Sequence, residues 1–197
     1  KIVAALCEPY NLASGIQHSS ASVGISLFDD AHRGVHDEPL KQAELAMYQS
    51  KDAGGNTLRF FDQEMQAVVS ARAALEFNLR EALALDQFLL CYQAQVNARG
   101  QITGAEGLIR WMDPRRGMVS PSEFIPLAEE TGLILPIGQW VLETGCNQLA
   151  RWAHQPHLAG LTLAINVSAR QFSQPDFVDK VLSTLEQTGA NPRRLKL

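Results

Sequence analysis

The second half of the chain alternates between strand-like and helix-like patterns of apolar residues. The strand-like segments alternate apolar with polar side chains or form compact apolar runs, whereas the helix-like segments repeat apolar residues every three or four positions. The predicted strands are 88–96, 102–111 and 161–167, and the predicted helices are 121–131, 136–152 and 174–188. Strands that alternate with helices predict an α/β fold built on a parallel sheet.

The first 62 residues predict two short strands and one helix. Residues 20–28 alternate in polarity, as a half-buried strand does, and residues 57–61 predict a second strand. The helix begins near Pro39 and ends at Gly54-Gly55, because glycine favours the backbone conformation that terminates a helix. The apolar side chains expected to face the core are Ala21, Val23, Ile25 and Leu27 from the first strand, and Leu40, Ala43 and Met47 from the helix.

A long segment without Gly or Pro separates the two halves. Residues 62–85 are rich in Ala, Glu, Gln, Leu and Arg, which are strong helix formers, so they predict one continuous helix. The sequence therefore predicts a first domain over 1–62, a connecting helix over 63–78 and a second domain over 79–197.

Composition and charge exclude several function classes. With 46% hydrophobic and 19% charged residues, the chain has the amino-acid composition of a globular protein. Its net charge of -4 argues against nucleic acid or a membrane surface as a partner, because either would need a strong positive field. The chain contains no apolar run long enough to span a membrane and no signal-peptide pattern, so any membrane attachment of the parent protein is expected upstream of Lys1. Three cysteines outside any CxxC pattern predict a reducing, cytoplasmic environment.

Candidate chemistry lies on two of the predicted strands. The period of two in strand 102–111 places Glu106 and Arg110 on the same face. Asn166 lies at the end of strand 161–167. In a closed α/β barrel, inward-facing residues near the carboxyl ends of strands line the active site. Carboxylate and amide oxygens are suitable ligands for Mg²⁺ or Mn²⁺, ions that phosphodiester hydrolysis commonly recruits, so Glu106 and Asn166 are candidate metal ligands.

Plainer interpretations of the same residues stay open at this point. Glu106 and Arg110 could form only an ion pair within one strand, and Asn166 could be a buried cap. His32 and His36 have the spacing of metal ligands, but Gly34 would interrupt any helix between them, so metal binding there is not favoured.

Several motifs of the second half resemble those of EAL domains. EAL domains typically contain YQP, then GAEALIRW, a loop like HPxxGxVxPxxFIPLAE, and NVSARQ. This chain has Tyr92-Gln93-Ala94, GAEGLIRW over 104–111, DPRRGMVSPSEFIPLAE over 113–129 and INVSARQF over 165–172. The resemblance is nearly continuous from residue 79 to residue 197.

This resemblance implies a fold, a reaction and a set of site residues. The fold is the first half of a TIM-like (β/α) barrel, and the reaction is metal-dependent hydrolysis of cyclic di-GMP to linear pGpG. A homodimer formed through the EAL domain is also consistent with the family. Carried over by position, Glu106 and Asn166 would bind Mg²⁺ or Mn²⁺ and serve catalysis, while Gln93, Leu108, Arg110 and Pro121 would bind the substrate.

The chain departs from the EAL pattern at two places. Gly107 replaces the alanine of the tripeptide that names the family, and Ala94 replaces a proline. Because Gly107 is predicted to point away from Glu106, we expect modest destabilisation and no loss of activity. The sequence also stops at Leu197, where the family would continue with another metal-binding glutamate, so this chain alone is expected to be inactive.

The first half resembles the end of a GGDEF domain, which has a ferredoxin-like α+β fold. The matching segments are SVGISLF over 22–28 and AELAMYQSKDAGGN over 43–56. Lys51 corresponds to a lysine that helps to hold phosphates in that family, but Gly55 and Glu44 replace its arginine and aspartate, and the GGDEF signature itself is absent from the sequence. Lys51 is therefore interpreted as a solvated residue near a helix end. The resemblance implies a tandem GGDEF-EAL protein with a degenerate GGDEF segment.

Two other functions remain for the parent protein. An inert EAL module could bind cyclic di-GMP as a sensor or act only as an interaction scaffold, since such a module could retain both Glu106 and Arg110. An unrelated barrel enzyme would require the motif matches to be coincidental.

Overall fold

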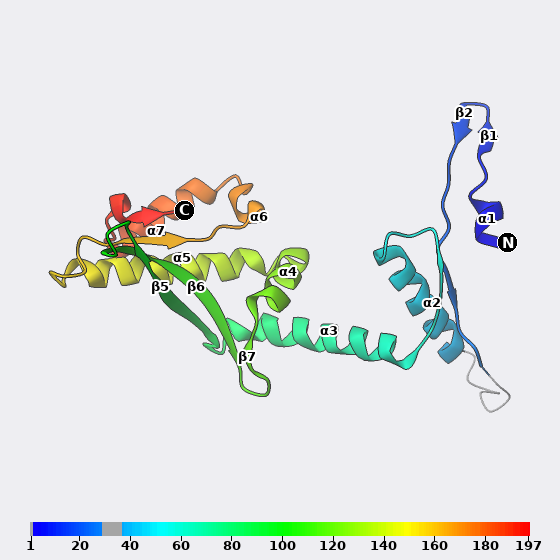
Figure 1. Cartoon of the computed structure of the whole chain (residues 1–197), viewed down its shortest axis with the longest axis horizontal. Coiled ribbons are helices and arrows are strands. Elements are labelled where there is room, and N and C mark those ends of the chain that lie inside the picture. The colour runs from blue at the N-terminus through cyan, green and yellow to red at the C-terminus, as the bar shows by residue number, and fades with distance from the viewer. Residues whose placement is uncertain (1, 29–36) are drawn as a thin grey trace. The chain divides into compact units, whose positions relative to one another are not determined.

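A single long helix, α3 (Gln63–Ala82), connects the two parts of the chain (Figure 1). The computed structural model describes residues 2–28 and 37–197, so His32 and His36 lie outside the described residues. The chain divides into two compact units, Lys1–Ala73 and Ala74–Leu197, and the division falls inside α3. The helix predicted over 62–85 is confirmed with slightly shorter ends. None of the described helices is long and apolar enough to cross a membrane.

The first unit contains two small pairs of strands. Helix α1 (Ile2–Leu6) precedes an antiparallel hairpin of β1 (Tyr10–Leu12) and β2 (Gly15–Gln17), which the sequence pattern does not predict. Strand β3 (Val23–Ile25) pairs in parallel with β4 (Leu58–Phe60), and α2 (Asp37–Asp52) packs on both.

The buried face of the first unit differs from the predicted one. The strand expected over 20–28 is formed only by residues 23–25, and Leu27 beyond it is 81% exposed. Leu40, in the first turn of α2, is also exposed, whereas Ala46 and Ser50 of that helix are fully buried. Gly24 explains the close fit: a Cβ at this position would collide with the backbone of α2 at Ala43 and Met47.

The second unit is built around one mixed sheet. Its long strands β5 (Phe88–Val96) and β6 (Ile102–Asp113) are antiparallel, whereas β6 runs parallel to β8 (Thr162–Ile165), and β8 runs parallel to the short β9 (Leu195–Lys196). The short β7 (Gly117–Val119), which was not predicted, pairs with the end of β6. Within the described residues the sheet is open, so the closed barrel stays a prediction.

Helices connect and cover these strands. Along the chain, α4 (Pro121–Thr131) and α5 (Ile134–Ala153) connect β7 to β8 (Figure 1). The connection from β8 to β9 contains the short α6 (Ala169–Phe172), α7 (Phe177–Thr188) and a 3₁₀ turn (Pro192–Arg194). The helices predicted over 121–131 and 136–152 are confirmed. The helix predicted over 174–188 begins later, at Phe177, and is preceded by a separate capped turn over 168–172.

The predicted alternation along β6 and β8 is confirmed by burial. On β6, Ala105 and Trp111 are buried, while Glu106, Leu108 and Arg110 between and beside them are only partly covered. On β8, Leu163 and Ile165 are buried against α5. The helices therefore pack against the apolar face of the sheet, whereas the polar face of β6 stays accessible.

Cys146 of α5 is fully buried among apolar side chains, and this burial raises the pKa of its thiol to about 11. We expect iodoacetamide at pH 8 to alkylate the exposed Cys91 and to leave Cys146 unmodified until the protein unfolds, since only about one Cys146 thiol in a thousand would be ionised. Peptide mass spectrometry would measure both rates. Equal alkylation of both cysteines in the folded protein would contradict this prediction.

The raised pKa of the Cys146 thiol also implies that the stability contributed by the neutral thiol is lost as the pH rises from about 9 through 11.

Candidate active site

Two polar side chains from neighbouring parallel strands meet where β8 ends beside β6 in the second unit. Glu106 lies within β6, and Asn166 directly follows the last residue of β8. The Asn166 Nδ2 atom donates a hydrogen bond to Glu106 Oε1 at 2.7 Å, although the residues are 60 positions apart. The register pairs Glu106 with Ala164, so Asn166 lies two residues farther along the same face. The structure thus brings together the two predicted metal ligands.

Gln93 lies on β5 directly opposite Glu106. Cross-strand partners project to the same side of a sheet, so the Gln93 amide and the Glu106 carboxylate share a face. The neighbouring Tyr92 projects to the other side, where its ring packs against Trp152 with centroids 5.6 Å apart. Burial raises the pKa of the Tyr92 hydroxyl, which therefore stays neutral at physiological pH. Gln93 is exposed and its amide is accessible to a ligand beside Glu106.

A cavity of about 320 Å³ lies beside the Glu106–Asn166 pair. Its walls include the remaining predicted substrate-binding residues, which are Leu108, Arg110 and Pro121, together with Asn166. The apolar part of the other walls includes Gly107 and Ile109 from the helix-facing side of β6, and Ile125, Ile134, Ile137 and Val141 from α4 and α5. An apolar cavity with a few polar groups at this size is typical of a small-molecule site. All six predicted site residues therefore lie in one region of the second unit.

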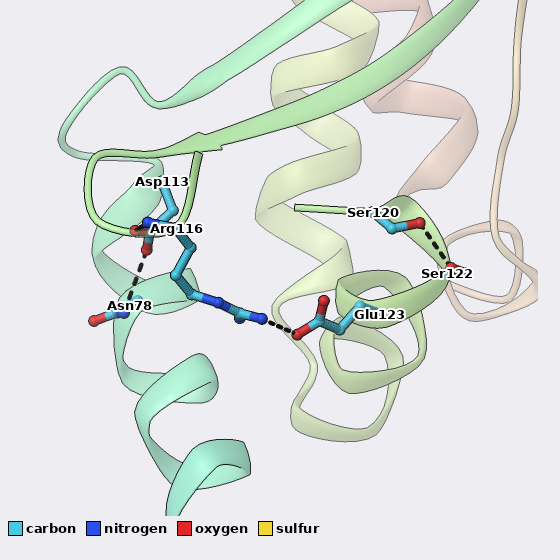
Figure 2. A network of polar contacts seen from close by, with 6 residues as sticks. All are labelled: Asn78, Asp113, Arg116, Ser120, Ser122 and Glu123. Carbon is cyan, nitrogen blue, oxygen red and sulfur yellow. Dashed lines mark hydrogen bonds and ion pairs between the residues drawn. The ribbon is translucent and has the colours of Figure 1, made fainter. Parts of the chain in front are cut away.

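The buried Asp113 at the end of β6 fixes the position of the β6–β7 turn (Figure 2). Its Oδ1 atom accepts hydrogen bonds from the backbone N–H groups of Arg115 and Arg116 at 2.7 and 2.9 Å, and its Oδ2 atom accepts one from Asn78 Nδ2 at 3.3 Å. The Arg116 guanidinium then forms an ion pair with Glu123 in the first turn of α4, at 2.6 Å. These contacts connect the end of β6 to the start of α4, where Pro121 lies.

The plainer interpretations of Glu106, Arg110 and Asn166 do not fit the structure. Within the described residues, Glu106 is bonded to Asn166, and the Arg110 guanidinium donates to the Ile109 carbonyl at 2.8 Å, so the two charges form no ion pair. Asn166 is exposed, and the helix cap that follows it is supplied by Ser168. The other N–H groups of the Arg110 guanidinium can donate hydrogen bonds to a phosphate oxygen.

The chemistry of the donor set fits part of a divalent-cation site. Glu106 supplies carboxylate oxygens and Asn166 an amide oxygen, which are hard ligands suited to Mg²⁺ or Mn²⁺. In the present rotamer Asn166 turns its NH₂ group to Glu106, and a half-turn of the amide would present the oxygen instead. No group of three or more His, Cys, Asp or Glu side chains capable of holding a metal occurs among the described residues. Glu106 and Asn166 are therefore two ligands of a set that would need further donors.

The structure shows which way a side chain at position 107 would point. A Cβ at this position would lie 3.4 Å from the Leu90 side chain, in ordinary van der Waals contact, and Leu90 packs on the helix-covered core. The added methyl group would therefore face away from the Glu106 carboxylate.

We expect Gly107→Ala to stabilise the protein by about 0.5–1 kcal/mol, because alanine loses less conformational freedom on folding than glycine. Turnover should stay close to that of the wild type. Urea unfolding and a hydrolysis assay on the intact protein would measure both. An inactive wild type whose activity is restored by Gly107→Ala would show that position 107 acts on the chemistry.

Sequence reasoning missed three polar side chains of the cavity wall, Glu129, Ser168 and Gln171. The signal for Gln171 was available, since Ser168 followed three residues later by Gln171 has the spacing of a helix capping box. Glu129 lies in the last turn of α4, and no sequence pattern indicates which way its side chain points.

Lys51 of the first unit fits the interpretation as a surface residue. It lies in the last turn of α2, and its Nζ atom is 5.4 Å from the centre of the Tyr48 ring. A cation at this end complements the helix dipole and stacks on an aromatic ring without any ligand.

Known proteins resemble this chain in sequence. The family model described as EAL domain matches residues 77–197. The bifunctional diguanylate cyclase/cyclic di-GMP phosphodiesterase MucR of Pseudomonas aeruginosa is 38% identical over 198 residues, covering 100% of this chain and 29% of that protein. The cyclic di-GMP phosphodiesterase PdeR of Escherichia coli is 34% identical over 187 residues, covering 95% of this chain and 28% of that protein. The chain thus spans less than a third of the length of these relatives.

Solved structures resemble it as well. The PaMucR phosphodiesterase in complex with c-di-GMP has a TM-score of 0.60 and 41% identity, over 62% of this chain and 49% of that chain. The FimX EAL domain of Xanthomonas citri in complex with c-diGMP has a TM-score of 0.57 and 28% identity, over 66% of this chain and 50% of that chain.

The fold and the site define a mixed α/β domain whose polar residues gather where β6 and β8 run in parallel. The family match covers most of the chain and all six predicted site residues. The chain belongs to the EAL domain family.

Proposed function

We propose that the protein containing this chain hydrolyses one phosphodiester bond of cyclic di-GMP to give linear pGpG, in a reaction that depends on Mg²⁺ or Mn²⁺. The observation that carries this proposal is the 2.7 Å contact between Glu106 and Asn166 beside the cavity lined by Arg110 and Pro121. The relatives named cyclic di-GMP phosphodiesterases and the EAL structures in complex with c-di-GMP support the choice of substrate.

The six predicted site residues fall into two groups, those that would bind the metal ion and those that would bind the substrate. Glu106 and Asn166 would hold the cation, which when bound neutralises phosphate charge and makes water a better nucleophile at neutral pH. Arg110 would donate hydrogen bonds to a phosphate oxygen, as guanidinium groups do in phosphate recognition. Gln93, Leu108 and Pro121 would contact the dinucleotide and orient it.

The hydrolysis itself needs only water as a co-reactant. The water oxygen forms a bond to one phosphorus atom, the bond from that phosphorus to the ribose 3′ oxygen breaks, and a proton reaches the leaving oxygen. The product is a linear dinucleotide with a terminal phosphate. Glu106 and Asn166 would supply only two of the ligands that the cation needs, so this chain by itself is expected to hydrolyse no cyclic di-GMP.

Residues 1–62 would be the degenerate end of a GGDEF domain, and residues 79–197 the first half of an EAL barrel, with residues 63–78 as the connecting helix. The first assignment is supported by the match of the whole chain to a protein named a bifunctional diguanylate cyclase/phosphodiesterase. The second is supported by the parallel strands β6, β8 and β9 of the mixed sheet, which helices connect. A homodimer formed through the EAL domain stays a prediction.

The second candidate function is binding of cyclic di-GMP without turnover. It would need no complete set of metal ligands, because Arg110 and the other residues that line the cavity beside Asn166 would suffice to hold the nucleotide. Gln93, Arg110 and the cavity would serve a sensor as well as an enzyme.

The test is a hydrolysis assay on the intact protein with Mg²⁺ or Mn²⁺, followed by separation of the nucleotides. We expect linear pGpG to accumulate and a chelator to stop its formation. Cyclic di-GMP that is bound but recovered intact would select the sensor function, and a protein that neither binds nor hydrolyses it would select the scaffold.

A further inference from the structure

A short capped turn directly follows Asn166. The Ser168 Oγ atom accepts a hydrogen bond from the Gln171 backbone N–H at 3.2 Å, and the Gln171 side-chain Oε1 atom accepts one from the Ser168 backbone N–H at 3.2 Å. The Ser168 hydroxyl also lies 3.0 Å from Gln171 Oε1. This reciprocal pair is a capping box, which fixes the backbone on entry to a helix. Here it fixes the backbone two residues after Asn166.

The Gln171 side chain rests against Gly138, a glycine inside α5. A Cβ at position 138 would come within 2.5 Å of Gln171 Oε1 and closer still to Nε2, so the amide can lie there only because residue 138 has no side chain. A glycine inside a helix of 20 residues lowers its stability relative to alanine. Gly138 and Gln171 also line both cavities that border Asn166, the one described above and a second of about 340 Å³ between α5 and α7.

Arg170 ties the same turn to α4. Its guanidinium donates to the carbonyls of Glu129 and Glu130 in the last turn of that helix, and one of its nitrogen atoms would lie 3.3 Å from a Cβ at Gly132, the left-handed C-cap. A cation at the carboxyl end of a helix is favoured by the helix dipole. The turn after Asn166 is therefore attached to α4 through Arg170 and to α5 through Gln171.

We infer that Gln171, seated on Gly138, is a positioning residue that holds the Asn166 amide within reach of Glu106 and so sets the affinity of this pair for a divalent cation. The inference rests on the proposed function, which makes Glu106 and Asn166 metal ligands. Gln171 itself lies among the residues that support the ligands. Groups that orient metal ligands in this way commonly change metal affinity or activity by 10- to 100-fold when they are removed.

The test is a Mn²⁺ titration of the intact protein followed by electron paramagnetic resonance, without nucleotide. We expect Gln171→Ala to raise the Mn²⁺ dissociation constant by about 10- to 100-fold. Gly138→Ala should have the same effect, because its methyl group displaces the amide that closes the capping box, while alanine itself is the better helix former. Gln171→Glu should restore binding close to the wild-type value, because glutamate closes a capping box equally well.

Asn191→Ala is the matched control. The Asn191 Oδ1 atom accepts a 3.0 Å hydrogen bond from the Arg193 N–H and so caps the 3₁₀ turn before β9. Strand β9 lies on the side of β8 that faces away from β6. This variant loses a comparable cap and should bind Mn²⁺ as the wild type does. Thermal melting of every variant separates lost affinity from lost folding.

The outcomes separate the two proposals. A wild-type protein that binds Mn²⁺, with Gln171→Ala folded and binding it equally well, would overturn the positioning role and leave the proposed function standing. The positioning role would also be overturned if Gln171→Glu bound Mn²⁺ as weakly as Gln171→Ala. A folded wild-type protein that binds no Mn²⁺ would overturn the metal-dependent function and this inference with it.

Discussion

Replacing Glu106 by glutamine in the intact protein is expected to reduce hydrolysis of cyclic di-GMP by at least about 100-fold, because loss of a direct metal ligand should exceed the 10- to 100-fold effect typical of its supporting partners. The substitution keeps the size and shape of the side chain and removes only its charge. Asn166 could still donate its hydrogen bond to the new amide oxygen, so the local fold should persist. Initial rates at saturating Mg²⁺ or Mn²⁺ would measure the effect.

Glu143→Gln provides the control. Glu143 lies on α5 and accepts a hydrogen bond from the Gln139 amide at 2.7 Å, which is the same kind of contact as that between Asn166 and Glu106. It is exposed and lines neither cavity that borders Asn166. We expect Glu143→Gln to retain wild-type turnover. Unchanged turnover in Glu106→Gln would remove Glu106 from the metal site.

The largest expected loss of stability comes from Trp111→Ala, at about 3–5 kcal/mol. Trp111 has no exposed surface, and its ring contacts Phe88 and Phe124 with centroids 6.2 and 5.8 Å apart. Its indole N–H also donates to Gln87 Oε1 at 3.1 Å, so truncation would leave both a large cavity and an unpaired acceptor.

Urea unfolding followed by tryptophan fluorescence would measure this loss. All three tryptophans of the chain lie in the second unit, so Trp140 and Trp152 still report on it in the variant. Met118→Ala, at a side chain that is 64% exposed in the same hairpin, should change the free energy of unfolding by less than about 0.5 kcal/mol. Similar midpoints for the two variants would contradict the assigned core.

Much of the site geometry could be predicted from local sequence pattern. The period of two along residues 102–111 is sufficient to place Glu106 and Arg110 on the face opposite Trp111, because side-chain direction in a strand alternates whatever the neighbours are. The strand before Asn166 shows the same alternation at Leu163 and Ile165, which are buried as expected. These predictions depend only on backbone geometry, and they are confirmed.

Features that depend on tertiary contacts could not be predicted in this way. Leu40 is apolar and was expected inside, but it is exposed, and the close approach of Gly24 to α2 falls at Ala43 and Met47 farther along the helix. The three residues of β7 have no pattern of their own and form a strand because Asp113 closes the turn before them. The contact of Gln171 with Gly138 joins two segments more than 30 positions apart, which no local pattern reveals.

The central claim is that Glu106 and Asn166 hold the same divalent cation, and a double-mutant cycle on Mn²⁺ binding tests it most directly. The intact protein would be titrated as the wild type, as Glu106→Gln, as Asn166→Ala and as the double variant. If both side chains bind one ion, we expect each single substitution to weaken binding strongly and the second substitution to add little, since residues in contact do not act additively. Fully additive losses, or Mn²⁺ binding that neither substitution changes, would contradict the account.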